Sequence, residues 1–364
     1  MRVKLEDVCE RGSSNIKQSD IIKMSGNYPI YGASGLAGKV NFYHQEQPYV
    51  AVVKDGAGIG RTTLNPAKSS VIGTMQYLIP KKNVLPEYLF YAVSYMHLEK
   101  YYTGATIPHI YFKDYKNEEF NLDNIEKQLE IIDVLGRCKK VIEARKQELV
   151  ELDSLTKARF VEMFGDPVAN EKGWTTKPLL DMGKCKNGMN FHYDDKGIEI
   201  NCLGVGDFKN LSIIDNTEEL PTILLNEMPS EEYLLKDDDI VFVRSNGNKA
   251  LVGRSLAVYP GDVPTTFSGF CIRYRKHDNE ITVPYLLRVL KTDSMRMKMA
   301  GRGANIQNLN QQILGTLVIP VPPVELQNQF AAFVTEVNKS KVKVQKALDE
   351  TQKLFDSLMQ QYFG

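Results

Sequence analysis

The chain has 364 residues, of which 43% are hydrophobic and 25% are charged, and its 45 basic and 45 acidic residues balance to a net charge of zero. This composition is typical of a soluble globular protein, and the length suffices for two domains with separate cores. The five scattered cysteines include no CxxC pair, which argues against a zinc site and favours reduced thiols.

No apolar run approaches the about 20 residues that a membrane span requires, and the charged start MRVKLEDVCE is not typical of a signal peptide. We therefore expect a cytoplasmic protein without membrane contact. A neutral total argues at first against a nucleic-acid partner, but the charges are unevenly distributed. Residues 205–239 hold ten acids and two bases, whereas residues 240–304 hold eleven bases and four acids.

The first 120 residues predict short strands joined by tight turns, because runs such as YPIYGASG, PYVAVVKDG and SSVIGTMQYLIP are β-branched or aromatic and end in glycine turns. A helix is expected over residues 86–102. The stretch KDGAGIGRTTL, residues 54–64, resembles a phosphate-binding loop in its glycines, but it lacks the lysine of a P-loop and the helix start of a dinucleotide fingerprint. We expect a hairpin there.

Residues 126–163 predict a long helix, because they lack proline, have one glycine and place apolar residues at alternating steps of four and three. An offset of 199 residues aligns this segment with the end of the chain. TGATIPHI (103–110) then meets RGANIQNL (302–309), and FG at 164–165 meets the terminal FG. RSNGNKALVGRSL, residues 244–256, resembles the glycine-rich stretch, and a second short helix is expected over residues 284–299.

The repeat predicts an α+β fold in which two mixed α/β domains in pseudo-twofold repeat are separated by two long helices that form an antiparallel coiled coil. The expected boundaries are 1–120 and 166–305 for the domains, and 121–165 and 306–364 for the helical regions. Two amphipathic helices that each pack on their own domain are the alternative. The coiled-coil and subunit-interface residues would be Ile131, Leu135, Ile142, Leu149, Leu152, Phe330, Val334, Val344, Leu348 and Phe355.

No catalytic or metal-binding pattern stands out. The five histidines have no partners at metal or triad spacing, and the sequence contains neither H-E-x-x-H nor G-x-S-x-G. We expect a non-catalytic chain that binds no metal or cofactor itself. Two similar but diverged domains on a symmetric scaffold suit the recognition of a bipartite site on DNA. An enzyme with an unrecognised site remains an alternative.

GATIPHI, GANIQNL, the helix starts IEKQLEII and VELQNQFAAF, and FVEMFGDP together resemble the specificity subunit of type I restriction–modification systems over nearly the full length. The resemblance implies two target-recognition domains that alternate with a central and a C-terminal conserved region. NEEFNLDN lacks the PVPP that precedes the second helix, which leaves the start of the first helix open.

The resemblance implies a subunit that reads double-stranded DNA with a bipartite target and performs no chemistry. Its expected partners are two modification subunits, which use S-adenosylmethionine to methylate adenine, and two restriction subunits, which use ATP and Mg. The helices would dock the modification subunits and set the spacing of the half-sites. The alternative is a two-domain protein-binding scaffold without DNA specificity, which would show no salt-sensitive DNA binding.

Phosphate and base contacts are expected from polar and cationic side chains on the hairpins. A solvated surface role is the alternative for each residue taken singly. Arg244, which follows the apolar run in DDDIVFV, is the foremost candidate. The predicted DNA-binding residues are Tyr31, Ser34, Lys39, Lys54 and Arg61 in the first domain, and Arg244, Asn246, Asn248, Lys249, Arg254 and Arg302 in the second.

Overall fold

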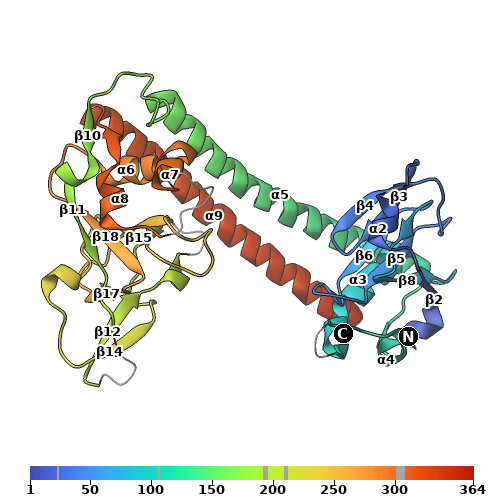
Figure 1. Cartoon of the computed structure of the whole chain (residues 1–364). Helices are drawn as coiled ribbons and strands as arrows, with labels where there is room; N and C mark the ends of the chain where they lie inside the picture. Colours follow the sequence, from blue (N-terminus) through green and yellow to red (C-terminus); the bar gives the residue numbers. More distant parts are fainter. Residues whose placement is uncertain (23, 105–106, 192–195, 209–211, 301–307) are drawn as a thin grey trace. The chain divides into compact units, whose positions relative to one another are not determined.

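The computed structural model describes residues 1–364 except 23, 105–106, 192–195, 209–211 and 301–307 (Figure 1). The chain divides into two compact units. The first unit contains Met1–Glu148 and Val344–Gly364, and the second unit contains Leu149–Lys343.

Two long helices of equal length run through both units: α5 (Ile125–Phe164) and α9 (Val324–Phe363), each of 40 residues. Their bounds differ by 199 at both ends, as the repeat predicts. The predicted start at residue 126 is off by one, and Asn124 explains how α5 begins without a proline-rich lead-in. Its Oδ1 accepts a hydrogen bond of 2.8 Å from the Lys127 N–H, which satisfies one of the free amides of the first turn.

The first unit is built on the antiparallel sheet β2-β8-β5-β6, with the smaller sheets β4-β3-β7 and β1-β9. Its strands are β1 (Arg2–Lys4), β2 (Cys9–Ser13), β3 (Tyr28–Gly32), β4 (Gly35–Val40), β5 (Tyr49–Val53), β6 (Thr62–Asn65), β7 (Ser70–Val71), β8 (Met75–Pro80) and β9 (Glu119–Asn121). Its short helices are α1 (Leu5–Val8), α2 (Gln18–Ile21), α3 (Pro86–Tyr95) and α4 (Phe112–Tyr115).

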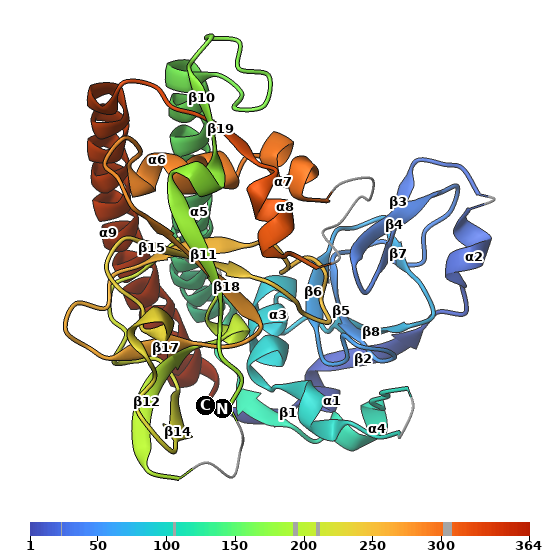
Figure 2. The same cartoon turned by 60° about the vertical axis from the view of Figure 1, so that its left-hand side comes forward.

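The second unit repeats this plan with the sheets β11-β18-β15-β16-β13, β14-β12-β17 and β10-β19. Its strands are β10 (Thr176–Pro178), β11 (Gly183–Asn187), β12 (Ile198–Leu203), β13 (Ile213–Ile214), β14 (Thr222–Leu225), β15 (Asp239–Val243), β16 (Ser255–Val258), β17 (Thr265–Phe267), β18 (Cys271–Lys276) and β19 (Val318–Pro320). Its short helices are α6 (Val283–Leu290), α7 (Asp293–Ala300) and α8 (Gln311–Gly315), which share a core with one face of the five-stranded sheet (Figure 2).

The central strand of each unit is buried on both faces. In β5, Val50 and Val52 pack in the core with α3 and the long helices, while Tyr49 and Val53 pack in the core under the smaller sheet. β15 alternates in the same way. Side chains alternate between the faces of a strand, so a continuous apolar run is required where both faces are covered. This explains the sequences YVAVV and DIVFV.

The long helices run antiparallel within each unit. In the first unit, Leu135 near the start of α5 shares a core with Met359 and Phe363 near the end of α9. In the second unit, Phe164 at the end of α5 shares a core with Phe330 near the start of α9, and their ring centroids are 5.6 Å apart. The predicted fold class, a duplicated α/β region with an antiparallel helix pair, is confirmed.

The short helices differ from the prediction. The helix expected over residues 86–102 ends at Tyr95, and His97 adopts a left-handed conformation with φ of 51°. A residue with that backbone conformation cannot continue a right-handed α-helix. The helix expected over residues 284–299 is divided into α6 and α7 at Thr292, whose hydroxyl donates to the Val289 carbonyl.

Candidate nucleic-acid interface

In each unit a hairpin joins the central strand, β5 or β15, to the next strand along the chain, and the two hairpins close with the same backbone bonds. In the first, the Val53 N–H donates to the Arg61 carbonyl and the Gly60 N–H donates to the Val53 carbonyl. In the second, Val243, Arg254 and Gly253 make the corresponding bonds. Gly60 and Gly253 have φ of 81° and 75°, a region that glycine enters without steric cost. The hairpin predicted for residues 54–64 is confirmed.

Lys54 and Arg244 begin these hairpins at equivalent places. The Ile110 N–H donates to the Lys54 carbonyl at 2.9 Å, and the Leu309 N–H donates to the Arg244 carbonyl at 2.9 Å. Ile110 and Leu309 are themselves 199 residues apart and buried. The segments TGATIPHI and RGANIQNL therefore end against the hairpins, and each fixes the backbone that carries a candidate cation.

In the first unit, Arg61 lies against the turn between β3 and β4. Its Nη1 donates to the Ala33 carbonyl at 2.9 Å, which brings the exposed Arg61 next to the exposed Ser34. Tyr31 is half-buried against the core below this turn. Lys39 is exposed but pairs with Pro29, toward the other end of the β3–β4 hairpin. The structure therefore groups Arg61, Ser34 and Tyr31, and sets Lys39 apart.

An acid–histidine pair supports the start of the first hairpin. The Asp55 carboxylate lies 2.7 Å from His109 Nδ1. The Gly56 N–H donates to the Pro108 carbonyl. The Lys54 ammonium lies 3.9 Å from the Asp55 carboxylate. Because the Asp55 carboxylate partly offsets the charge of Lys54, Lys54 should attract a phosphate less strongly than an isolated lysine would. Neither role was predicted from the sequence, although His109 lies in the repeated segment TGATIPHI.

In the second unit, two of the candidate amides shape the loop. Asn246 Oδ1 accepts from the Asn248 N–H at 2.8 Å, and Asn248 Oδ1 accepts from the Ala250 N–H at 3.1 Å. These are Asx turns, in which the side-chain oxygen is already used by the backbone. Lys249 beside them is exposed.

The arginines of the second unit are less exposed than Arg61. Arg244 is half-buried, and its Nη1 donates to the Gly269 carbonyl at 3.3 Å. Arg254 is half-buried and close to Arg296. Burial lowers the pKa of the Arg296 guanidinium, and the charge of Arg254 lowers it further. Arg302 lies outside the described residues, and its predicted role stays a prediction.

The residues predicted for the helix interface fall into two groups. Those that are buried are Ile131, Leu135, Ile142, Phe330 and Leu348. Those that are half-buried are Leu149, Leu152, Val334, Val344 and Phe355. This burial is consistent with a seam of the predicted period, and the contacts of these residues with partner subunits stay a prediction.

Across the described ranges, no helix is long and apolar enough to span a membrane, and no three His, Cys, Asp or Glu side chains are arranged to hold a metal ion.

The family model described as the type I restriction modification DNA specificity domain matches residues 1–153 and 171–351. The type I restriction enzyme StySPI specificity subunit of Salmonella potsdam is 28% identical over an alignment of 207 residues, and the match covers 52% of this chain. The match spans only 42% of that protein, less than half of its length.

Two solved structures resemble the whole chain. The S subunit of a type I restriction–modification system from M. genitalium has a TM-score of 0.60 and 17% identity, with 100% of this chain and 96% of that chain covered. A chain from a structural study of complex assembly in a type I R-M system has a TM-score of 0.58 and 14% identity, with 100% and 97% covered. At these identities the likeness shows the fold alone. Because the family model matches most of its length, the chain belongs to the family of the type I restriction modification DNA specificity domain.

Proposed function

We propose that this chain is the non-catalytic DNA sequence-specificity subunit of a type I restriction–modification complex, and that each unit reads one half of a bipartite site through its hairpin. The observation that carries the proposal is the equivalence of the two hairpins. Their backbones make the same bonds, but their tips differ in length and side chains. An unchanged frame with different side chains suits two readers of different short sequences.

The recognition regions would be residues 1–120 and 166–305, and the helical regions 121–165 and 306–364. The helical regions would dock two modification subunits and set the spacing of the half-sites. A helix of 40 residues is about 60 Å long, which bounds that spacing at about 18 base pairs.

The complex would also contain two restriction subunits. S-adenosylmethionine would serve the modification subunits, and ATP and Mg would serve the restriction subunits, so this chain needs no cofactor of its own. The family match and the name of the StySPI relative support these partners.

A methylome tests the proposal. The chain is expressed with its modification subunit in a host free of adenine methylation, and N6-methyladenine is mapped over the genome. The expected result is one new motif with two short specified halves around a fixed gap. An assembled, active modification subunit that yields no motif would contradict the proposal and favour a protein-binding scaffold.

The same measurement tests the spacing. Seven residues are inserted into both helices at equivalent places, after Ala144 in α5 and after Lys343 in α9, so that antiparallel pairing is kept. Each insertion adds about 10 Å, and the gap should widen by about three base pairs. The same seven residues inserted at Lys172, in the loop after α5, should leave the gap unchanged. A constant gap in the helix variant would refute the spacing role while leaving sequence recognition intact.

A further inference from the structure

The second unit contains a pocket of about 370 Å³ between α5, α6 and α9. Its lining includes the apolar side chains of Leu287 and Val334. Four cationic and two acidic side chains also line it, which gives an excess of two positive charges. These side chains are Lys157, Arg288, Lys291, Lys341, Asp153 and Asp215.

Three of the cations are only partly compensated. Lys341 forms an ion pair with Asp153, and the Lys291 ammonium donates to the Ser212 hydroxyl at 2.8 Å. The Arg288 Nε is buried and donates to no residue that the structure describes. Burial lowers the pKa of Lys291 to about 8, and the charges of Arg288 and Lys341 contribute to this shift. Closely spaced cations of this kind repel one another, so an anion between them would be stabilised.

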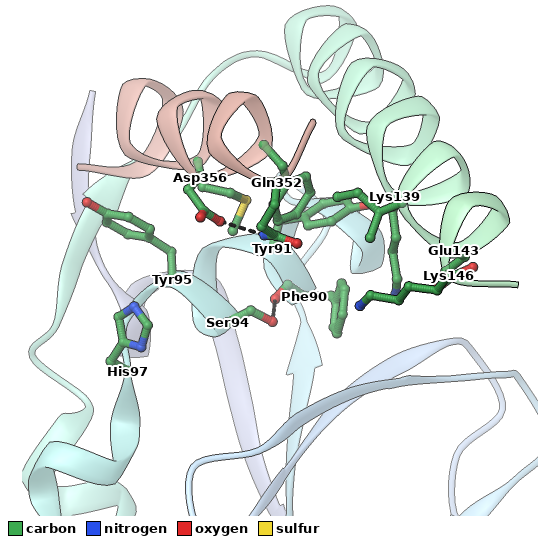
Figure 3. A pocket seen from close by; sticks show the side chains of 13 residues that line it. Phe90, Tyr91, Ser94, Tyr95, His97, Lys139, Glu143, Lys146, Gln352 and Asp356 are labelled. Atoms are coloured by element: carbon green, nitrogen blue, oxygen red, sulfur yellow. Dashed lines mark hydrogen bonds between the residues drawn. The ribbon is translucent and has the colours of Figure 1, made fainter. Parts of the chain in front are cut away.

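The first unit has an equivalent pocket of about 580 Å³, between α3, α5 and α9 (Figure 3). The equivalence follows from Tyr88 and Tyr285. Both hydroxyls donate to the carbonyl of the third residue of a matching strand, Asn121 in β9 and Pro320 in β19. An offset of 197 therefore relates α3 to α6, while 199 relates α5 to α9.

At these offsets, uncharged residues of the first unit's pocket correspond to three of the four cations in the second unit's pocket. Tyr91 and Ser94 stand at the positions of Arg288 and Lys291, and Ile142 stands at the position of Lys341. Ser94 donates to the Phe90 carbonyl at 2.7 Å and so satisfies itself within α3 (Figure 3).

Charge balance also separates the pockets. The charged side chains of the first pocket are Lys139, Lys146, Glu143 and Asp356, which balance to zero apart from His97. The same helix arrangement therefore forms without the three cations. Since burial of charge is costly, a role in folding does not explain why they are present in the second pocket.

We propose that the pocket of the second unit binds a small organic anion, with a phosphate or carboxylate group among Arg288, Lys291 and Lys341 and an apolar body against Leu287 and Val334. The volume is in the range of small-molecule sites, which combine apolar walls with a few polar anchors. The half-buried position of the cations in a concave site favours a small ligand over the backbone of a DNA duplex. The proposal does not depend on the function proposed above.

Calorimetric titration of the full chain tests the proposed anion site. The probes are phenyl phosphate and phenylacetate, and phenol and inorganic phosphate serve for comparison. Saturable binding of phenyl phosphate or phenylacetate with one site per chain is expected, at least about tenfold tighter than phenol. The stronger of the two probes identifies the preferred head group. Failure of both to bind, or binding no tighter than phenol, would overturn the proposal.

The repeat supplies a variant that should fold. Arg288→Tyr, Lys291→Ser and Lys341→Ile together install the side chains of the first pocket, and the combined variant should lose at least about tenfold in affinity. Lys343→Met, an exposed lysine two residues along α9, should bind as the wild type does. Unchanged binding by the triple variant would show that the ligand lies elsewhere. Displacement of the probe by duplex DNA would assign the cations to a nucleic-acid surface and also overturn the proposal.

Discussion

Gln128 and Gln327 are fully buried and make the same three hydrogen bonds in the two units. Gln128 accepts from the Leu85 N–H at 2.8 Å and donates to two carbonyls, at 3.0 and 2.8 Å. Gln327 accepts from the Thr282 N–H at 2.8 Å and donates to two carbonyls, at 2.9 and 2.8 Å. Each amide thus joins the first turn of a long helix to the segment that leads into α3 or α6.

Replacement of Gln128 by Leu should destabilise the first unit by about 2–3 kcal/mol, because a buried N–H and two carbonyls lose their partner. Hydrogen exchange of the Leu85 amide is the direct measurement, and its protection should fall. Gln345→Leu, on the exposed surface of α9, serves as the control and should change exchange little. Unaltered protection at Leu85 would show that the amide network does not hold this junction.

Arg244→Ala and Lys54→Ala should each affect one half of the proposed DNA site. Loss of a bidentate contact with guanine costs about 1–3 kcal/mol and relaxes one position, whereas loss of a phosphate contact weakens binding on all sequences. Methylome mapping of each variant distinguishes the two results. The exposed Lys82→Ala is the control. If both variants relax the same half-site, the assignment of one hairpin to each half is wrong.

Phe363→Ala should loosen the first unit, and Phe164→Ala should loosen the second. Phe363 packs on Tyr88 with ring centroids 5.1 Å apart, and Phe164 packs on Tyr285 at 4.7 Å. Truncation of a buried phenylalanine costs about 3–5 kcal/mol. Hydrogen exchange should rise in one unit for each variant. The exposed Phe270→Ala should leave both units protected. A uniform rise over the chain would instead indicate that the units unfold together.

The pH dependence of stability should reveal Lys291. Its folded-state pKa of about 8 lies below the ordinary value of 10.5, so the unfolded chain binds more protons between these values. The free energy of unfolding of the wild type should therefore rise with pH through this window, relative to Lys291→Met. Urea titrations at pH 7, 9 and 10.5 measure the difference between the two proteins. A constant difference would mean that Lys291 keeps an ordinary pKa.

The long helices could be predicted from the sequence, because the repeat of 199 residues and the period of the apolar residues are both properties of continuous segments of the chain. An offset that pairs Gln128 with Gln327 also pairs the ends of α5 and α9. The repeat did not predict the order of the strands in the sheets. The two copies match poorly in their strand regions, as the different lengths of the hairpins after Val53 and Val243 show. The division at Thr292 was not predicted, because it involves a side-chain hydroxyl that donates to the Val289 carbonyl, three residues earlier in the chain.

The candidate site was predictable only in part. A GR pair in both hairpins indicated that Arg61 and Arg254 are equivalent, and the backbone bonds confirm it. Contacts with DNA remain predictions for all of these residues. The cationic pocket could not be found from the sequence, because Arg288 and Lys291 come from one part of the chain and Lys341 from another, and only the fold brings them together.

The order in which the chain is synthesised differs from the order in which its cores can close. The second unit is one continuous stretch, Leu149–Lys343, whereas the first unit needs Met359 and Phe363 from the last helix. Domains usually fold from the N-terminus as they leave the ribosome. Here the N-terminal core must wait for the last 21 residues, Val344–Gly364. A released chain that stops before Val344 should hold a folded second unit and a first unit whose Leu135 and Tyr88 are uncovered, and would be a substrate for chaperones.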